Sequence, residues 1–194
     1  MNFSVFFYNL IPGAYFTSNL LLMLFMCGCL KEDVSILGCD GLILTLFTLA
    51  SLTFGFIFYG IRNYFQICDK GTFKNVINNR ALRLDDTLKG SEKLLIEQLN
   101  KTKMILWNQD KHKLHDHYST ISTLFTNLVI ACLFSIIMWL VLTPFYKSEI
   151  AKLVYVHLTI LNAYGVWFFF RLAISFRRSE HEILIQQQQY LVEK

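Results

Sequence analysis

The chain has 194 residues, of which 54% are hydrophobic and 16% are charged. Soluble domains have about 45–50% apolar and about 25% charged residues, so this composition predicts a membrane protein. Only two prolines and nine glycines are present, which argues against a loop-rich or disordered chain. The net charge of +4 is not evidence for nucleic-acid binding, because the placement of the basic residues has a simpler explanation in membrane topology.

Four segments lack Asp, Glu, Lys and Arg over lengths that can cross a hydrocarbon layer of about 30 Å, which takes about 20 helical residues. They are Asn2–Leu30, Gly41–Ile61, Ser119–Tyr146 and Leu153–Phe170. A segment in lipid must satisfy its own backbone groups, and none of the four shows the alternation of a barrel strand. The sequence therefore predicts an all-α polytopic membrane protein with four transmembrane helices and extended cytoplasmic helices.

Pro12 and Gly13 interrupt the first span and leave two interpretations open. Apolar residues recur at helical spacing before the break, over residues 3–11, which is typical of a helix lying in the membrane interface. Spanning would then begin near Ala14. The other interpretation is one long tilted helix with a proline kink.

The loop after the first span is flanked by Cys27, Cys29 and Cys39. If the loop faces an oxidising compartment, Cys39 could form a disulfide with Cys29 or Cys27. Cysteine is also a common apolar filler near the ends of spans, so free thiols are the alternative.

The spans contain uncharged polar and small residues in place of charged ones, which removes the usual proton relays, voltage sensors and ion-coupled transport sites. The residues in question are Ser51, Gly55, Asn127, His157 and Asn162. Small residues and amides most often form contacts between helices. We therefore predict helix packing at these positions, with a pore lined by Asn127 and Asn162 as the alternative.

The chain contains two amphipathic patterns outside the predicted spans, one in its charged middle and one in its tail. Leu95, Leu99 and Leu106 share a face in the sequence "KGSEKLLIEQLNKTKMILWNQDKHKLHDHY", and Ile183, Leu184 and Tyr190 share a face in the tail. No Pro or Gly occurs between Ser91 and Thr143, which allows one helix of about 75 Å that runs into the third span.

An apolar stripe outside the bilayer must be covered by its own chain, by further copies or by another protein. We predict partner binding at these six residues, through oligomerisation and docking of a cytoplasmic effector protein. The oligomer is a homo-oligomer, with a tetramer as one candidate, and membrane lipid surrounds it. Seven acidic residues interleave with the eleven basic ones of residues 62–118, so we predict no direct contact with nucleic acid.

Catalytic and metal-binding patterns are absent from the sequence. His112, His115 and His117 form H-x-x-H-x-H ahead of the third span, but a metal would need further ligands, and solvated histidines near the headgroups are the favoured interpretation. No nucleophile elbow, P-loop, dinucleotide-binding turn or H-E-x-x-H motif occurs. We predict no enzymatic activity, no metal and no cofactor.

Lys and Arg are distributed unequally over the connecting segments. Residues 62–118 contain eleven and residues 171–194 contain four, out of eighteen in the chain. Because short cytoplasmic loops collect positive charge, both termini and the long middle segment are predicted to face the cytoplasm of a bacterial inner membrane. The predicted organisation is a first transmembrane hairpin with an N-terminal interfacial segment (1–61), a cytoplasmic helical region (62–118), a second transmembrane hairpin (119–170) and a cytoplasmic C-terminal helix (171–194).

With four spans in about two hundred residues, inner termini and a long inner helical loop, the chain resembles the membrane subunit of the Kiwa anti-phage defence system. The four-span accessory protein of some type VI CRISPR systems is similar in outline. The resemblance implies a homo-oligomer that senses perturbation of the envelope and works with a cytoplasmic partner.

Three functions remain as hypotheses from the sequence. The first is a non-enzymatic membrane scaffold or sensor that recruits a soluble effector. The second is a small channel or pore-forming effector that perturbs the membrane potential. The third is a membrane immunity protein against a pore-forming toxin.

Overall fold

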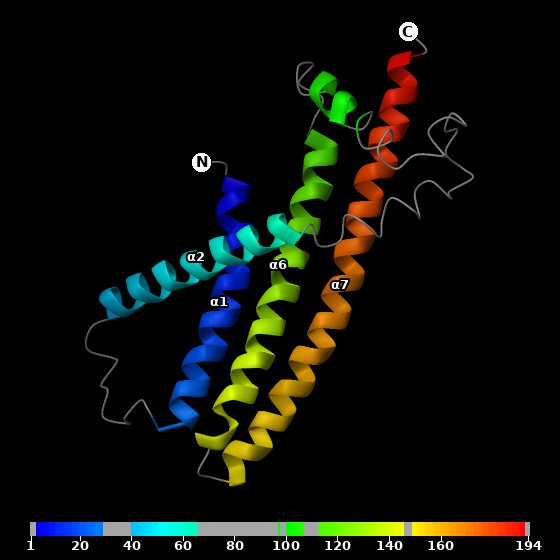
Figure 1. Cartoon of the computed structure of the whole chain (residues 1–194). Coiled ribbons are helices and arrows are strands. Elements are labelled where there is room, and N and C mark those ends of the chain that lie inside the picture. The colour runs from blue at the N-terminus through cyan, green and yellow to red at the C-terminus, as the bar shows by residue number, and fades with distance from the viewer. Residues whose placement is uncertain are drawn as a thin grey trace. The chain divides into compact units, whose positions relative to one another are not determined.

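The structure is a computed structural model that describes residues 3–28, 40–65, 97, 100–106, 113–145 and 149–192. Over these ranges it consists of α1 (Phe3–Met26), α2 (Asp40–Phe65), α6 (Lys113–Leu142), the 3-10 turn η2 (Thr143–Phe145), α7 (Glu149–Val192) and the helical segment 100–106 (Figure 1). The described part of the chain is all-helical, which confirms the all-α part of the predicted class.

Four helices are long and apolar enough to cross a membrane by length and composition. The stretches are Phe6–Met26, Leu44–Phe65, Asp116–Phe145 and Glu149–Gln187. Each overlaps one of the predicted spans. The last stretch has 39 residues, about twice the length that a span needs, and its longest part without charged residues is 153–170.

The chain divides into two compact units. Unit 1 comprises residues 1–65 and 124–170, and unit 2 comprises residues 66–123 and 171–194. Unit 1 thus contains the greater part of all four charge-free segments, and unit 2 contains most of the charged sequence.

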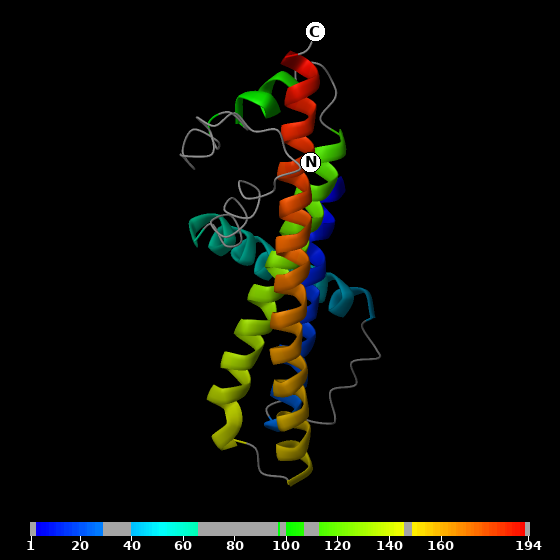
Figure 2. The same ribbon diagram turned by 90° about the vertical axis from the view of Figure 1, so that its right-hand side faces the viewer.

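Within unit 1, α2 crosses α1 instead of running alongside it (Figures 1 and 2). The crossing depends on two glycines whose missing side chains let the backbones touch. A Cβ added at Gly13 would overlap the Ser51 carbonyl oxygen, and one added at Gly55 would overlap the Asn9 carbonyl oxygen. Such close approach through small residues is the usual way in which helices associate in lipid.

Aromatic rings fill the space beside this crossing. The Phe16 ring lies 4.8 Å from Phe54, 5.5 Å from Phe58 and 6.4 Å from Phe134, centroid to centroid, in edge-to-face geometry. Phe16 and Phe58 are buried. Each such pair contributes about 0.5–1.5 kcal/mol beyond the area that it buries, so α1, α2 and α6 are held together by directional contacts.

Local sequence explains where α1 and α6 end. Gly28 has a positive φ of 71°, a conformation that glycine adopts at little cost, and its N–H bonds back to the Phe25 carbonyl oxygen at 2.9 Å. Pro144 disfavours helical geometry in the residue before it, and α6 ends at Leu142 with the turn η2 following.

Two helices continue where the sequence suggested a border. α1 is one helix with Pro12 inside it, so the structure has the long continuous helix and not a separate interfacial helix before Ala14. α7 runs for 44 residues, about 66 Å, through the border between the predicted fourth span and the predicted C-terminal helix. No Pro or Gly follows Gly165, so nothing in the sequence stops the helix there.

Candidate interaction site

The candidate site lies in unit 2, on the part of α7 that follows the charge-free residues 153–170. Ala173, Glu180 and Leu184 are all fully buried. Their spacings of seven and four residues place them on one face of the helix. A carboxylate is therefore fully buried on this face, and burial of its charge requires partners.

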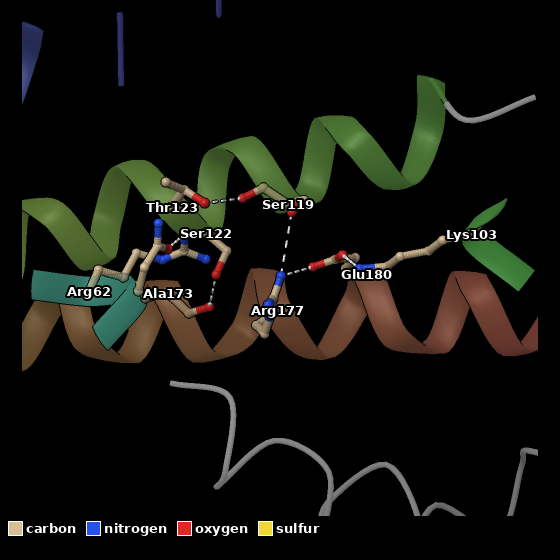
Figure 3. Close-up of polar contacts among 9 residues, drawn as sticks. Arg62, Lys103, Ser119, Ser122, Thr123, Ala173, Arg177 and Glu180 are labelled. Carbon is tan, nitrogen blue, oxygen red and sulfur yellow. Dashed lines mark hydrogen bonds and ion pairs between the residues drawn. The ribbon is translucent and has the colours of Figure 1, made fainter. Parts of the chain in front are cut away.

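Two cations hold the Glu180 carboxylate (Figure 3). The Lys103 ammonium nitrogen lies 2.7 Å from Oε1, and the Arg177 guanidinium donates to Oε2. Arg177 Nη1 also lies 3.4 Å from Ser119 Oγ on α6. These four residues, the Glu180 cluster, join α7, the start of α6 and the segment 100–106 within unit 2.

The charges around Glu180 keep its carboxylate ionised. Burial by itself would raise the pKa of this carboxyl group, because the charged form loses its water. The positive charges of Arg177 and Lys103 outweigh burial and hold the pKa below its ordinary value of 4.5. Glu180 lies ten residues beyond Phe170, outside the predicted fourth span. At neutral pH the Glu180 cluster is therefore a charged network.

Acid should weaken unit 2 through this group. Because the pKa of Glu180 is lower in the folded than in the unfolded chain, its contribution to stability is complete above about pH 4.5 and disappears as pH falls through the folded value. Thermal unfolding of the purified protein in detergent should therefore separate the wild type from Glu180→Gln most at neutral pH, with the difference shrinking in acid. A difference that stays constant down to about pH 3 would contradict this contribution.

Small side chains let α6 approach α7 beside the cluster. Ser122 Oγ donates to the Ala173 carbonyl oxygen at 3.0 Å, and both residues are buried. One turn earlier, the Tyr118 ring lies 6.0 Å from the Phe176 ring. The first turns of α6 are thus packed against α7 by a buried hydrogen bond and an aromatic contact.

The residues predicted to bind a partner have different environments. Leu106 and Leu184 are buried by the chain itself, with 2% and 0% of their surface exposed, and Ile183 is half-buried. Leu95, Leu99 and the side chain of Tyr190 lie outside the described residues. At Leu106 and Leu184, the apolar stripe is therefore covered by intramolecular packing.

The segment 100–106 also has an outer apolar face that the predicted stripe of Leu95, Leu99 and Leu106 does not include. Thr102 and Leu106 are buried on its inner face, whereas Met104 and Ile105 are 67% and 44% exposed. We call Met104 and Ile105 the Met104 patch. Exposed Lys101 lies close by on the same segment and is paired with Glu97 at 3.3 Å, so the patch is apolar with charges beside it.

The predicted packing residues of the spans lie in unit 1. Ser51 and Gly55 are buried at the crossing of α1 and α2, and Asn127 and Asn162 are fully buried. His157 is exposed, and its Nδ1 lies 2.8 Å from the carbonyl oxygen of Leu153 on its own helix. Four of the five residues thus lie between helices of unit 1, and His157 lies on its surface.

The two asparagines contact α1 through hydrogen bonds. Tyr15 donates its hydroxyl to Asn162 Oδ1 at 2.8 Å, and Asn162 Nδ2 donates to the Leu158 carbonyl oxygen at 2.8 Å. Asn127 Nδ2 donates to the Tyr8 carbonyl oxygen at 3.2 Å. Amides that bridge helices in this way stabilise packing in an apolar environment.

Metal and thiol chemistry has few candidates in the described ranges. There, no three His, Cys, Asp or Glu side chains gather in a geometry that could hold a metal ion. His112, the side chain of His115, Cys29 and Cys39 lie outside those ranges, so the predicted disulfide does as well. Cys132 is a buried free thiol.

No protein-family model, curated protein or solved structure matches this chain.

Proposed function

We propose that this protein is a non-enzymatic integral membrane scaffold or sensor that forms a homo-oligomer and recruits a cytoplasmic effector protein. The proposal rests mainly on how the helices of unit 2 are held together. α7 continues without a break beyond Phe170, and its buried Glu180 fixes the segment 100–106. The Met104 patch is therefore held on an ordered surface, as a docking site requires.

The proposed orientation has both termini and unit 2 in the cytoplasm of a bacterial cell, with the four apolar helices in the inner membrane. Fifteen of the eighteen Lys and Arg residues support it, since they lie in residues 62–118 and 171–194. In this orientation the Met104 patch faces the cytoplasm.

Exposed apolar surface supports the homo-oligomer. On α7, Leu153, Ile160 and Trp167 are 64%, 63% and 57% exposed, and on α2, Leu44 and Leu49 are 66% and 61% exposed. In a membrane such surfaces are covered by lipid or by further copies of the chain. The chain also resembles the Kiwa membrane subunit in outline, and we therefore propose that it acts in defence against phage.

The contacts of Asn127 and Asn162 favour the scaffold over the channel. Both side chains are fully buried, and both are hydrogen-bonded to groups of unit 1. A residue that lines a conducting pathway needs access to water. The buried asparagines therefore favour a scaffold over a channel.

Recruitment can be tested by substituting the Met104 patch. Met104→Ser together with Ile105→Ser should reduce by about tenfold the co-purification of any soluble protein that is encoded by a neighbouring gene and binds the wild type, since exposed apolar anchors dominate docking energy. The measurement is the ratio of the two proteins after affinity purification from solubilised membranes. Since both side chains are exposed, the melting temperature of the membrane protein itself should stay unchanged.

The matched control is Leu114→Ser, because Leu114 is 52% exposed at the start of α6 in the same unit. This variant should retain the partner at the wild-type ratio. Undiminished recruitment by the Met104/Ile105 double variant would exclude docking at this patch.

A further inference from the structure

Pro12 creates a defect in the backbone of α1. It lies inside the helix Phe3–Met26 and is buried, but proline has no N–H. The Tyr8 carbonyl, four residues earlier, therefore lacks the donor that a helix normally supplies, and the proline ring pushes that carbonyl away from the axis.

A side chain of another helix supplies the missing donor. Asn127 of α6 donates its Nδ2 to the Tyr8 carbonyl oxygen at 3.2 Å, although the two residues are 119 positions apart. Asn127 is fully buried. In an apolar environment neither the carbonyl nor the amide has water as an alternative partner. The hydrogen bond between them therefore replaces the hydration that both groups would have in water.

The surroundings of Pro12 limit where α1 can bend. Gly13 is in backbone contact with Ser51, and the Asn9 carbonyl is in contact with Gly55. The residues from Asn9 to Gly13 are therefore fixed against α2. The Tyr8 ring also meets α2, at a centroid distance of 6.0 Å from the Tyr59 ring. Residues 3–7 therefore precede this contact, and the Asn127 hydrogen bond falls on the carbonyl of the residue that follows them.

We propose that Pro12 and Asn127 form a hinge in α1. While the Asn127 amide bonds to the Tyr8 carbonyl, α1 is one continuous helix. When the amide withdraws, the Tyr8 carbonyl loses its donor, and residues 3–7 bend away from the helix axis ahead of the contact with α2 and change their angle to that helix. The hinge is a property of unit 1 and does not depend on the proposed recruitment of an effector.

A double-mutant cycle tests the hinge. Pro12→Ala restores the N–H for the Tyr8 carbonyl and makes the Asn127 amide redundant. In detergent-purified protein, Asn127→Leu should lower the melting temperature by about 5 °C in the wild-type background and by less than half as much in the Pro12→Ala background. Equal losses in the two backgrounds would overturn the proposal.

The control is Asn162→Leu, since Asn162 is equally buried but bonds to Tyr15 and Leu158. Its loss in melting temperature should be the same with and without Pro12→Ala. If Asn127→Leu yields no folded protein, the proposal requires that Pro12→Ala restore the yield, and a failed restoration overturns it.

The change in angle has its own readout. Spin labels at Phe7 (42% exposed) and Ile150 (76% exposed), in a background without other cysteines, report the distance between the start of α1 and the start of α7. Asn127→Leu should broaden or shift this distance distribution, and Pro12→Ala should return it to the wild-type form. An unchanged distribution in folded Asn127→Leu would also overturn the hinge.

Discussion

Gly55→Leu is expected to abolish the packing of α1 against α2 and to leave little folded protein after solubilisation. The first atom of any side chain at this position would meet the carbonyl oxygen, carbonyl carbon and Cα of Asn9. These are backbone atoms that cannot rotate away, so the two helices must separate. Overpacking of this kind destabilises the fold by at least about 3 kcal/mol. The measurement is size-exclusion chromatography after heating, in which the variant should lose its monodisperse peak.

Gly60→Leu is the matched control on the same helix. A Cβ at Gly60 meets no atom within 4 Å, and the residue is exposed. This variant should elute and melt as the wild type does, since leucine suits a lipid-facing position. Equal behaviour of the two variants would mean that α1 and α2 do not meet at Gly55.

The second large effect is expected for Glu180→Gln. Glutamine keeps the shape of glutamate but removes the charge that neutralises Lys103 and Arg177, whose side chains are 33% and 14% exposed. Removing one partner of a buried ion pair costs about 3–5 kcal/mol, and the partial exposure of Lys103 favours the lower end. The measurement is denaturant or thermal unfolding at neutral pH.

Glu182→Gln provides the comparison, because Glu182 also pairs with an arginine on α7. Arg178 Nε lies 2.8 Å from Glu182 Oε1, and the side chains of Arg178 and Glu182 are 46% and 28% exposed. Loss of this more exposed ion pair should lower the free energy of unfolding by less than about 1 kcal/mol. A second test is Glu180→Gln combined with Lys103→Met, which should recover part of the loss. Equal costs for the two glutamates would contradict the buried role of Glu180.

The four apolar helices were predictable because a predominantly apolar run of about 20 residues without charge is characteristic of a membrane-spanning helix. The packing role of Ser51 and Gly55 was also predictable, since small residues at helical spacing favour close approach. The helix that packs against these two residues was not predictable, because a stripe of small residues fits many surfaces. Only the tertiary structure identifies Gly13 and Asn9 as their partners.

The Glu180 cluster was missed although its signal was present. Ala173, Glu180 and Leu184 follow a helical repeat, and Arg177 stands three residues before Glu180. A helical wheel of the tail would have placed the glutamate among apolar residues. Lys103 could not have been named as its partner, because 77 residues separate the two and no local pattern fixes such a distance.

The sequence left the continuity of α1 open and gave no indication of the continuity of α7, for opposite reasons. Pro12 is a valid stop signal, but a donor from Asn127 compensates for it. At Phe170 no stop signal exists, and only the change from apolar to charged composition suggested a border. The composition of a segment indicates whether lipid or water suits it, but it does not indicate where the helix ends.

An unbroken α7 also means that rotation about its axis cannot be lost in a connecting loop. Each residue of a helix advances by about 100°, so a turn of residues 171–192 about the helix axis by one position would carry the Glu180 carboxylate away from Lys103. The contact between Glu180 and Lys103 therefore sets the angle of this part of α7 about its own axis within unit 2.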